Sequence, residues 1–229
     1  MKSIVWEKII EYIPKILPYF YISAGYVVLS FLIGSLLALL LAYFKIAGGR
    51  LARRLAFAYT TAMRCVPSIV LLFLSYYGLI YAGKNLGLNF TGDNKFLYVV
   101  FTFSLFIAGS MSEVIRSAYE AVEKGQWDAG VSIGLTPVMV LCEIIFPQAF
   151  RYALPNIGNS IIYLFKEGAL AYTIGLIDMI GKGNQLIGTD RGHALEIYLA
   201  LACIYWPLSI VLERFFGFLE KKFSKSYER

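Results

Sequence analysis

Several charged side chains of this chain interrupt long apolar stretches of its sequence. A charge near the centre of a bilayer costs roughly 2.5–3.5 kcal/mol on insertion scales, so each one must be paired, lie near an interface or face a water-filled cavity. Together with neighbouring amide and hydroxyl groups, they could bind both the ammonium and the carboxylate of a zwitterionic amino acid. The residues predicted to line such a path are Arg64, Glu113, Arg116, Asn159, Ser160, Lys166 and Glu167.

The same charges have a second interpretation, in which they only hold helices together. Glu113 and Arg116 are three residues apart, so they share one face of a helix and could neutralise each other. Lys166 and Glu167 are adjacent, so their side chains diverge and each needs a partner elsewhere. The sequence leaves both interpretations open.

The composition shows what kind of solvent must surround the elements that carry these charges. Of 229 residues, 59% are hydrophobic and only 16% are charged, whereas soluble domains carry roughly 25% charge. A soluble chain of this length has too little interior to hide so much apolar surface, which excludes a soluble globular enzyme, a disordered chain and a secreted disulfide scaffold. Neither a metal site nor a catalytic group is predicted: Cys65, Cys142 and Cys203 have no ligand or redox spacing and are expected to pack as small apolar residues, and His193 is expected at the surface.

The apolar runs predict an all-α integral membrane protein with five transmembrane helices, since a span needs about 20 mostly apolar residues. Within the first run, Ser30, Gly34, Ala38 and Ala42 form a stripe of small residues, which favours close helix packing either inside the chain or between subunits. Glycines and prolines punctuate residues 129–146, so short helices and a turn are expected there instead of a span. The predicted spans are residues 16–44, 55–83, 96–119, 156–177 and 194–216.

Lys and Arg residues predict the orientation of these spans. They gather in the connections after the first and third spans and beyond the fifth, which places the N-terminus outside and the C-terminus in the cytoplasm. Residues 1–18 are expected to form an interfacial helix with Trp6, Ile9, Ile10, Ile13 and Leu17 on one face. Residues 19–217 then form the membrane domain, with a cytoplasmic loop at 120–155, and residues 218–229 form a basic tail.

The cytoplasmic loop carries the most specific motif of the sequence. It contains Asp128-Ala129-Gly130, then Gly134 and Leu135, then Ile144 and Phe146-Pro147. An acidic residue at the start of a short helix is stabilised by the helix dipole, Gly134 permits a left-handed turn, and Pro147 is expected to end the second helix. The predicted product is a helix–turn–helix that projects from the membrane; a plain amphipathic connector is the alternative.

This spacing resembles the EAA loop in the membrane subunits of bacterial ABC importers. That family's pattern is Glu-Ala-Ala, three residues, Gly, nine residues, Ile, one residue and Leu-Pro; here Asp replaces Glu, Gly replaces Ala and Phe replaces Leu without a change of spacing. The flanking Ser112–Arg116, Lys124–Trp127 and Ala153–Pro155 segments resemble polar amino acid permeases of the histidine, glutamine, arginine and cystine type. Ser160 stands where members often have Glu, which bears on substrate charge.

The resemblance implies a type I ABC importer transmembrane domain in a prokaryotic cytoplasmic membrane. It implies that ATPase subunits dock on the loop, that a second permease, identical or related, completes the pathway, and that an extracytoplasmic binding protein delivers the amino acid. No nucleotide-binding loop is present in the sequence, so ATP and Mg²⁺ are expected on the ATPase partner, with no cofactor in this chain and no nucleic acid partner. The residues predicted to dock the ATPase are Asp128, Ala129, Gly130, Gly134 and Leu135.

Two rival functions have sequence features that count against them. An ion-coupled secondary carrier usually has structural repeats, and this chain shows none. A membrane scaffold without transport activity would have no use for intramembrane charges.

Overall fold

Helices make up nearly all of the described part of the chain. The computed structural model describes residues 4–88 and 90–225, and in this part of the chain no residue lies in a β-strand. The N-terminal extreme of the predicted interfacial segment and the end of the predicted tail, residues 1–3 and 226–229, lie outside the described residues. In chain order the elements are α1 (Trp6–Ile16), η1 (Leu17–Tyr19), α2 (Phe20–Ala47), α3 (Arg50–Cys65), α4 (Ser68–Asn85), α5 (Lys95–Glu120), α6 (Lys124–Ser132), α7 (Pro137–Met139), the π-helix η2 (Val140–Ile145), α8 (Phe146–Glu167), η3 (Gly168–Ile174), α9 (Met179–Thr189), η4 (Arg191–His193) and α10 (Ala194–Lys225).

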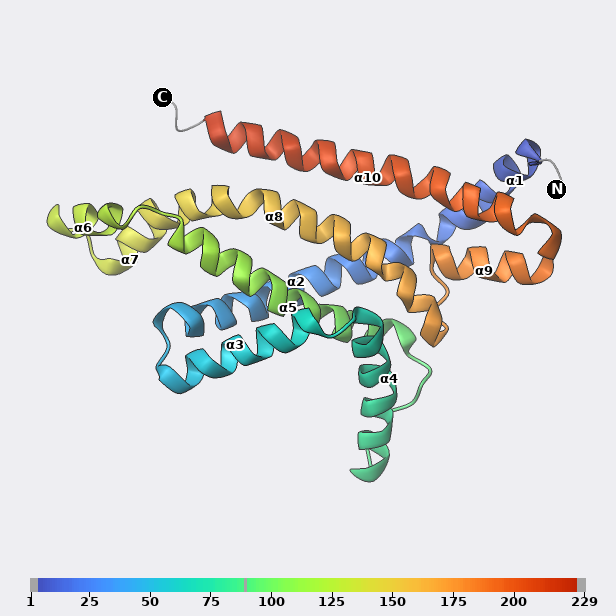
Figure 1. Ribbon diagram of the computed structural model, residues 1–229, viewed down its shortest axis with the longest axis horizontal. Helices are drawn as coiled ribbons and strands as arrows, with labels where there is room; N and C mark the ends of the chain where they lie inside the picture. The colour runs from blue at the N-terminus through green and yellow to red at the C-terminus, as the bar shows by residue number, and fades with distance from the viewer. Residues whose placement is uncertain (1–3, 89, 226–229) are drawn as a thin grey trace. The chain divides into compact units, whose positions relative to one another are not determined.

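The long helices confirm a multi-pass membrane architecture (Figure 1). Within the described residues, four helical stretches are long and apolar enough to cross a membrane, and a fifth is reached if the bent pair α3–α4 counts as one span. The four stretches are Trp6–Ala47, Lys95–Glu120, Pro137–Ile174 and Arg191–Phe223.

The second predicted span is not one straight helix. α3 ends at Cys65 and α4 begins at Ser68, and the two are bent by 107°. Pro67 causes the break, because it has no N–H to donate and its ring disfavours a helical conformation at Val66. Its backbone is extended, and its carbonyl instead accepts hydrogen bonds from the first turn of α4.

By its contacts the chain divides into two compact units. The first comprises Met1–Leu32, Val66–Ser104 and Ile162–Val211, and the second comprises Ile33–Cys65, Leu105–Ile161 and Leu212–Arg229. The small-residue stripe of α2 is buried along its length by the chain itself, and Ser30 Oγ donates a 3.2 Å hydrogen bond to the Val100 carbonyl. Of the two interpretations of this stripe, the structure therefore supports packing within the chain.

A buried carboxyl group organises the core of the first unit. Asp178 is fully buried, and its side chain caps the N-terminus of α9 by accepting a 2.9 Å hydrogen bond from the Gly181 N–H. Its other oxygen accepts from the Tyr26 hydroxyl at 3.0 Å and from the Ser23 hydroxyl at 3.3 Å. Because buried polar groups are costly unless they are hydrogen-bonded, this cluster fixes how α2 and α9 pack.

Gly168, directly after α8, allows Tyr26 to reach this carboxyl, because a Cβ here would overlap the tyrosine hydroxyl. Gly168→Ala is therefore expected to destabilise the chain by about 1–3 kcal/mol, as overpacked cores typically are. The thermal unfolding midpoint in detergent measures the effect. Gly78→Ala is the matched control, since a Cβ there meets nothing within 4 Å; equal midpoints for the two variants would contradict the assignment.

The N-terminal helix α1 packs within the first unit through one face and leaves part of the predicted interfacial face exposed. Ile9, Tyr12 and Ile16 are buried, while Trp6 and Ile10 are 70% and 71% exposed. The Tyr12 hydroxyl donates a 2.6 Å hydrogen bond to Asp190, whose other oxygen lies 2.8 Å from His193 Nδ1. These contacts lower the pKa of Asp190, the Tyr12 hydrogen bond most of all, and they fasten α1 to the turn before α10.

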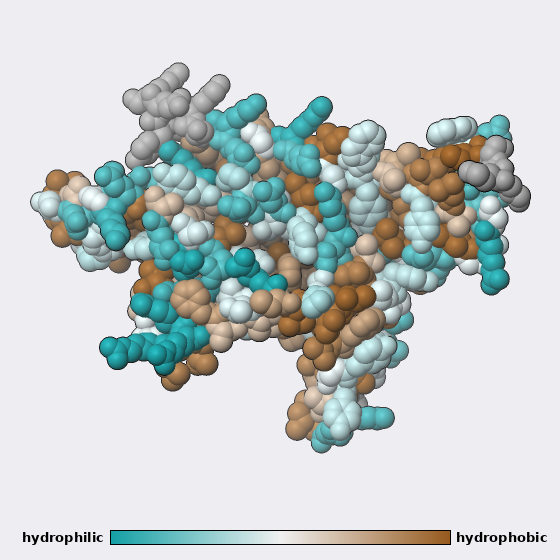
Figure 2. Space-filling model, viewed as in Figure 1, coloured by the Kyte–Doolittle hydropathy of each residue, from teal (hydrophilic) through white to brown (hydrophobic). Residues whose placement is uncertain are grey.

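Apolar side chains also cover much of the outer surface, as the brown areas of Figure 2 show. The three cysteines belong to this surface: Cys65, Cys142 and Cys203 are all free and exposed. Cys203 lies on α10, in a stretch apolar and long enough to cross a membrane, where a small apolar residue need not point inward because lipid tails are as apolar as the core.

Candidate functional site

The loop predicted to dock an ATPase forms a compact helical hairpin in the second unit. α6 ends in a left-handed turn at Gly134, where φ is +87°. The Gly134 N–H donates to the Val131 carbonyl at 3.0 Å, and the Leu135 N–H donates to the Gly130 carbonyl at 3.2 Å. This pair of bonds is a Schellman motif, which satisfies carbonyls at the end of a helix and requires the positive φ that glycine adopts without strain.

The two arms of the hairpin pack around a small apolar core. Val122, Val140 and Ile145 are buried there, with Trp127 and Leu135 packed against them. Gly130 is buried as well, and a Cβ at this position would lie 2.8 Å from a Val140 methyl group. Gly130 and Leu135, both predicted docking residues, therefore shape the hairpin from inside.

The outer surface of the hairpin mixes polar and apolar residues, with a single acidic residue among the predicted docking positions. Asp128, Ala129 and Gly134 are exposed. Ile133 and Val138, which the sequence interpretation missed, are 77% and 69% exposed. Apolar residues exposed at the tip of a polar projection typically mark a surface for another protein. Their position close to the turn glycine Gly134 is the sequence feature that could have identified them as exposed.

Two local predictions about this hairpin are wrong. α6 begins at Lys124 with Glu123 in the N-cap position, so Asp128 lies in the second turn, where the helix dipole gives it little stabilisation. Pro147 does not end the second helix, because α7, the π-helix and α8 follow one another without a non-helical residue. A proline is tolerated in the first turn of a helix, and Pro147 is the second residue of α8, directly after the wider π-helical turns.

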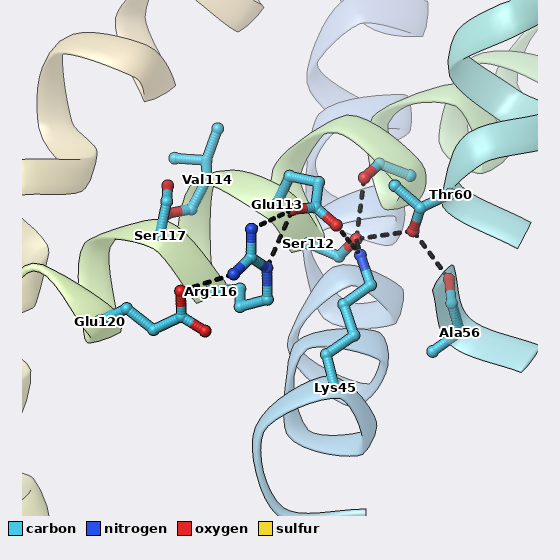
Figure 3. A network of polar contacts seen from close by, with 10 residues as sticks. Lys45, Ala56, Thr60, Ser112, Glu113, Val114, Arg116, Ser117 and Glu120 are labelled. Carbon is cyan, nitrogen blue, oxygen red and sulfur yellow. Dashed lines mark hydrogen bonds and ion pairs between the residues drawn. The ribbon is translucent and has the colours of Figure 1, made fainter. Parts of the chain in front are cut away.

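The charged residues predicted to line a substrate path are only partly brought together. Glu113 accepts a 2.6 Å hydrogen bond from Lys45 on one oxygen, and bonds of 2.9 and 2.8 Å from the Arg116 guanidinium on the other (Figure 3). The expected pairing of Glu113 with Arg116 is therefore present. Lys45 was not predicted, because it lies 68 residues away along the chain.

The other predicted path residues have separate surroundings. Arg64 is exposed at the end of α3, and Asn159 is exposed on α8. The Ser160 hydroxyl donates a 2.8 Å bond to the Asn156 carbonyl of its own helix. In the first unit, Lys166 is exposed, whereas Glu167 is half-buried and accepts a hydrogen bond from the Ser68 hydroxyl at the start of α4.

The long apolar helices define a multi-pass integral membrane protein. Residues 30–225 match the family described as "Binding-protein-dependent transport system inner membrane component", and the chain belongs to this family. The resemblance to ABC importer permeases is therefore confirmed. In this family the chain is a transport component, and a separate subunit is the ATPase, so the chain is not itself an enzyme.

Two similar proteins of this family carry names that refer to amino acid transport. The chain is 34% identical over 219 residues to the L-cystine transport system permease protein TcyL of Bacillus subtilis (strain 168), covering 96% of this chain and 91% of that protein. It is 33% identical over 230 residues to the probable amino-acid permease protein YxeN of the same organism, covering 99% of each.

Solved structures of ABC transporters have a similar fold. A crystal structure of an amino acid ABC transporter with histidines superposes with a TM-score of 0.84 at 25% identity, covering 96% of this chain and all of that one. An inward-facing form of the MetNI methionine ABC transporter shares the fold, with a TM-score of 0.68 at 15% identity over 90% of this chain and 92% of that one.

Proposed function

We propose that this chain is a permease subunit of an ATP-driven importer for a polar amino acid, and that the α6–α7 hairpin receives the ATPase. The observation that carries the proposal is the hairpin itself: a rigid glycine turn with Asp128, Ala129, Ile133 and Val138 exposed around it. Such a surface is unfavourable in water and is stabilised when a partner covers it.

The proposed assembly has three kinds of protein partner. Two ATPase subunits, which bind ATP and Mg²⁺, dock on the hairpins of two permeases, either two copies of this chain or this chain and a related one. An extracytoplasmic binding protein delivers the substrate from the other side of the prokaryotic cytoplasmic membrane. This arrangement requires the hairpin and the C-terminus to be cytoplasmic and the N-terminus to be outside, the orientation that the basic residues favour.

For the substrate we propose a zwitterionic amino acid. The L-cystine permease TcyL and the amino-acid permease YxeN are consistent with this class. Five predicted path residues present groups suited to a carboxylate and an ammonium: Arg64, Asn159, Ser160, Lys166 and Glu167. Glu113 and Arg116 remain candidates, but their charged atoms already contact each other and Lys45.

Asp128→Lys is the variant that tests docking, because it reverses the exposed charge of the hairpin without entering its core. The variant is expected to reach the membrane in normal amount, to lose co-purification of the ATPase, and to lower amino acid uptake in proteoliposomes at least tenfold. The matched control is Asp93→Lys, an exposed aspartate between α4 and α5, for which no loss is expected. Normal uptake with Asp128→Lys, or ion-driven uptake by this chain without an ATPase, would overturn the proposal.

A further inference from the structure

A buried lysine joins three helices of the second unit. The Lys45 side chain is fully buried at the end of α2, and its ammonium donates to Ser112 Oγ at 2.7 Å and to Glu113 Oε1 at 2.6 Å, both on α5. α3 contributes Phe57, whose ring centre lies 5.4 Å from the Lys45 ammonium and 5.7 Å from the Arg116 guanidinium. We call these four polar residues and Phe57 the Lys45 cluster; Figure 3 shows its four polar residues.

Stability alone does not account for the ionic character of this cluster. A buried ion pair is often no more stabilising than apolar residues of similar volume, because both charges lose their hydration. What such a pair provides is a directional link, since Lys45 can donate to both Ser112 and Glu113 only while the end of α2 faces them. The cluster therefore fixes the position of α2 relative to α5.

The cluster is connected to the hairpin through the last two turns of α5. Arg116, which binds Glu113, also donates a 2.5 Å bond to Glu120, the final residue of that helix. The last turn of α5 also contacts the core of the hairpin, because Tyr119 packs against the buried Val122, Val140 and Ile145. Displacement of the hairpin therefore moves the end of α5, and with it the carboxylate that holds Lys45.

We propose that Lys45 is a positioning residue that transmits movement of the docked hairpin to α2. This inference rests on the proposed docking function, and it adds a specific route from the hairpin into the membrane helices. Lys45 contacts neither the ATPase nor the substrate in this proposal; it acts through Glu113. Its loss should consequently separate ATP hydrolysis from transport without preventing assembly.

The experiment compares Lys45→Met, which keeps the apolar stem of the side chain, with the wild type in the full transporter in proteoliposomes. Three quantities are measured: the amount of co-purified ATPase, the ATP hydrolysis rate in the presence of the binding protein, and amino acid uptake. Lys45→Met is expected to keep the first two within twofold and to lower uptake per ATP hydrolysed at least tenfold. Lys45→Arg, which retains the charge, should restore part of that ratio.

Two further variants test whether the loss of uptake per ATP in Lys45→Met results from breaking the pair of Lys45 and Glu113. In Lys45→Met/Glu113→Gln the loss of uptake per ATP should not exceed that of the more impaired single variant, because both changes break one link. Lys15→Met breaks the exposed Lys15–Glu11 pair of α1 and should leave the ratio unchanged.

The outcomes distinguish this inference from the docking proposal. Loss of the ATPase from Asp128→Lys but not from Lys45→Met supports both, and an unchanged uptake per ATP in Lys45→Met overturns the role of Lys45 alone. An equal loss of hydrolysis and uptake would also overturn it. If Lys45→Met fails to accumulate, Ser112→Ala decides, because it removes one contact without stranding a charge: an uptake per ATP at least threefold lower supports the role, and an unchanged ratio overturns it.

Discussion

Gly134→Pro is expected to abolish uptake while the chain still inserts into the membrane. Proline fixes φ near −65°, whereas this position has φ of +87°, so the turn between α6 and α7 cannot form. The substitution also removes the N–H that donates to the Val131 carbonyl. We expect uptake below one tenth of the wild-type rate in proteoliposomes, with an unchanged amount of chain in the membrane fraction.

Gly134→Asn is the control for this prediction. Asparagine adopts the left-handed conformation more readily than other non-glycine residues, so this variant should keep most of the uptake. Equal uptake for the asparagine and proline variants would show that the turn conformation is not what matters.

Asp178→Ala is expected to cause the largest loss of stability. The change removes the N-cap of α9, which costs about 1 kcal/mol, and leaves the buried Ser23 and Tyr26 hydroxyls without their acceptor, at about 1–3 kcal/mol each. The expected loss in free energy of unfolding is on the order of 3 kcal/mol, measured by denaturation of the chain in detergent micelles. An effect below about 1 kcal/mol would contradict the structural role of this carboxyl.

Asp178→Asn is expected to change how the stability of the chain depends on pH, as well as the stability itself. Burial raises the pKa of the Asp178 carboxyl above its ordinary value. The folded chain therefore holds this proton more tightly than the unfolded chain, so stability falls as the pH rises from about 4 through the raised pKa. Asparagine cannot ionise, so the decrease due to this residue should be absent from its thermal unfolding midpoints across the same range. A decrease as steep as in the wild type would exclude Asp178 as its source.

The parts of the structure that were predictable from sequence are those set by local chemistry. Gly134 takes the expected left-handed turn because few other residues can, and Glu113 pairs with Arg116 because residues three apart on a helix face each other. The spacing of the loop motif likewise predicted the family correctly.

The parts that were not predictable depend on contacts between distant residues. Lys45 stands at the end of an uncharged run and gives no sign of a partner in α5. Tyr12 of α1 bonds to Asp190, far along the chain, so helical periodicity alone does not show which residues of α1 pack against the rest of the protein. At Pro147 the rule that proline ends helices failed, because the residue falls in the first turn of α8.

The two arms of the hairpin differ in how they join the membrane helices, and so in their mechanical stiffness. The second arm, α7 and the π-helix, continues into α8 without a non-helical residue. A change in the tilt of this arm would therefore tilt α8 with it. The first arm, α6, is separated from α5 by the non-helical residues 121–123. It is linked to α5 by side-chain packing. If the hairpin receives the ATPase as proposed, looser packing inside it would therefore weaken the link to α5 before the link to α8, and the two helices would respond unequally to the same movement.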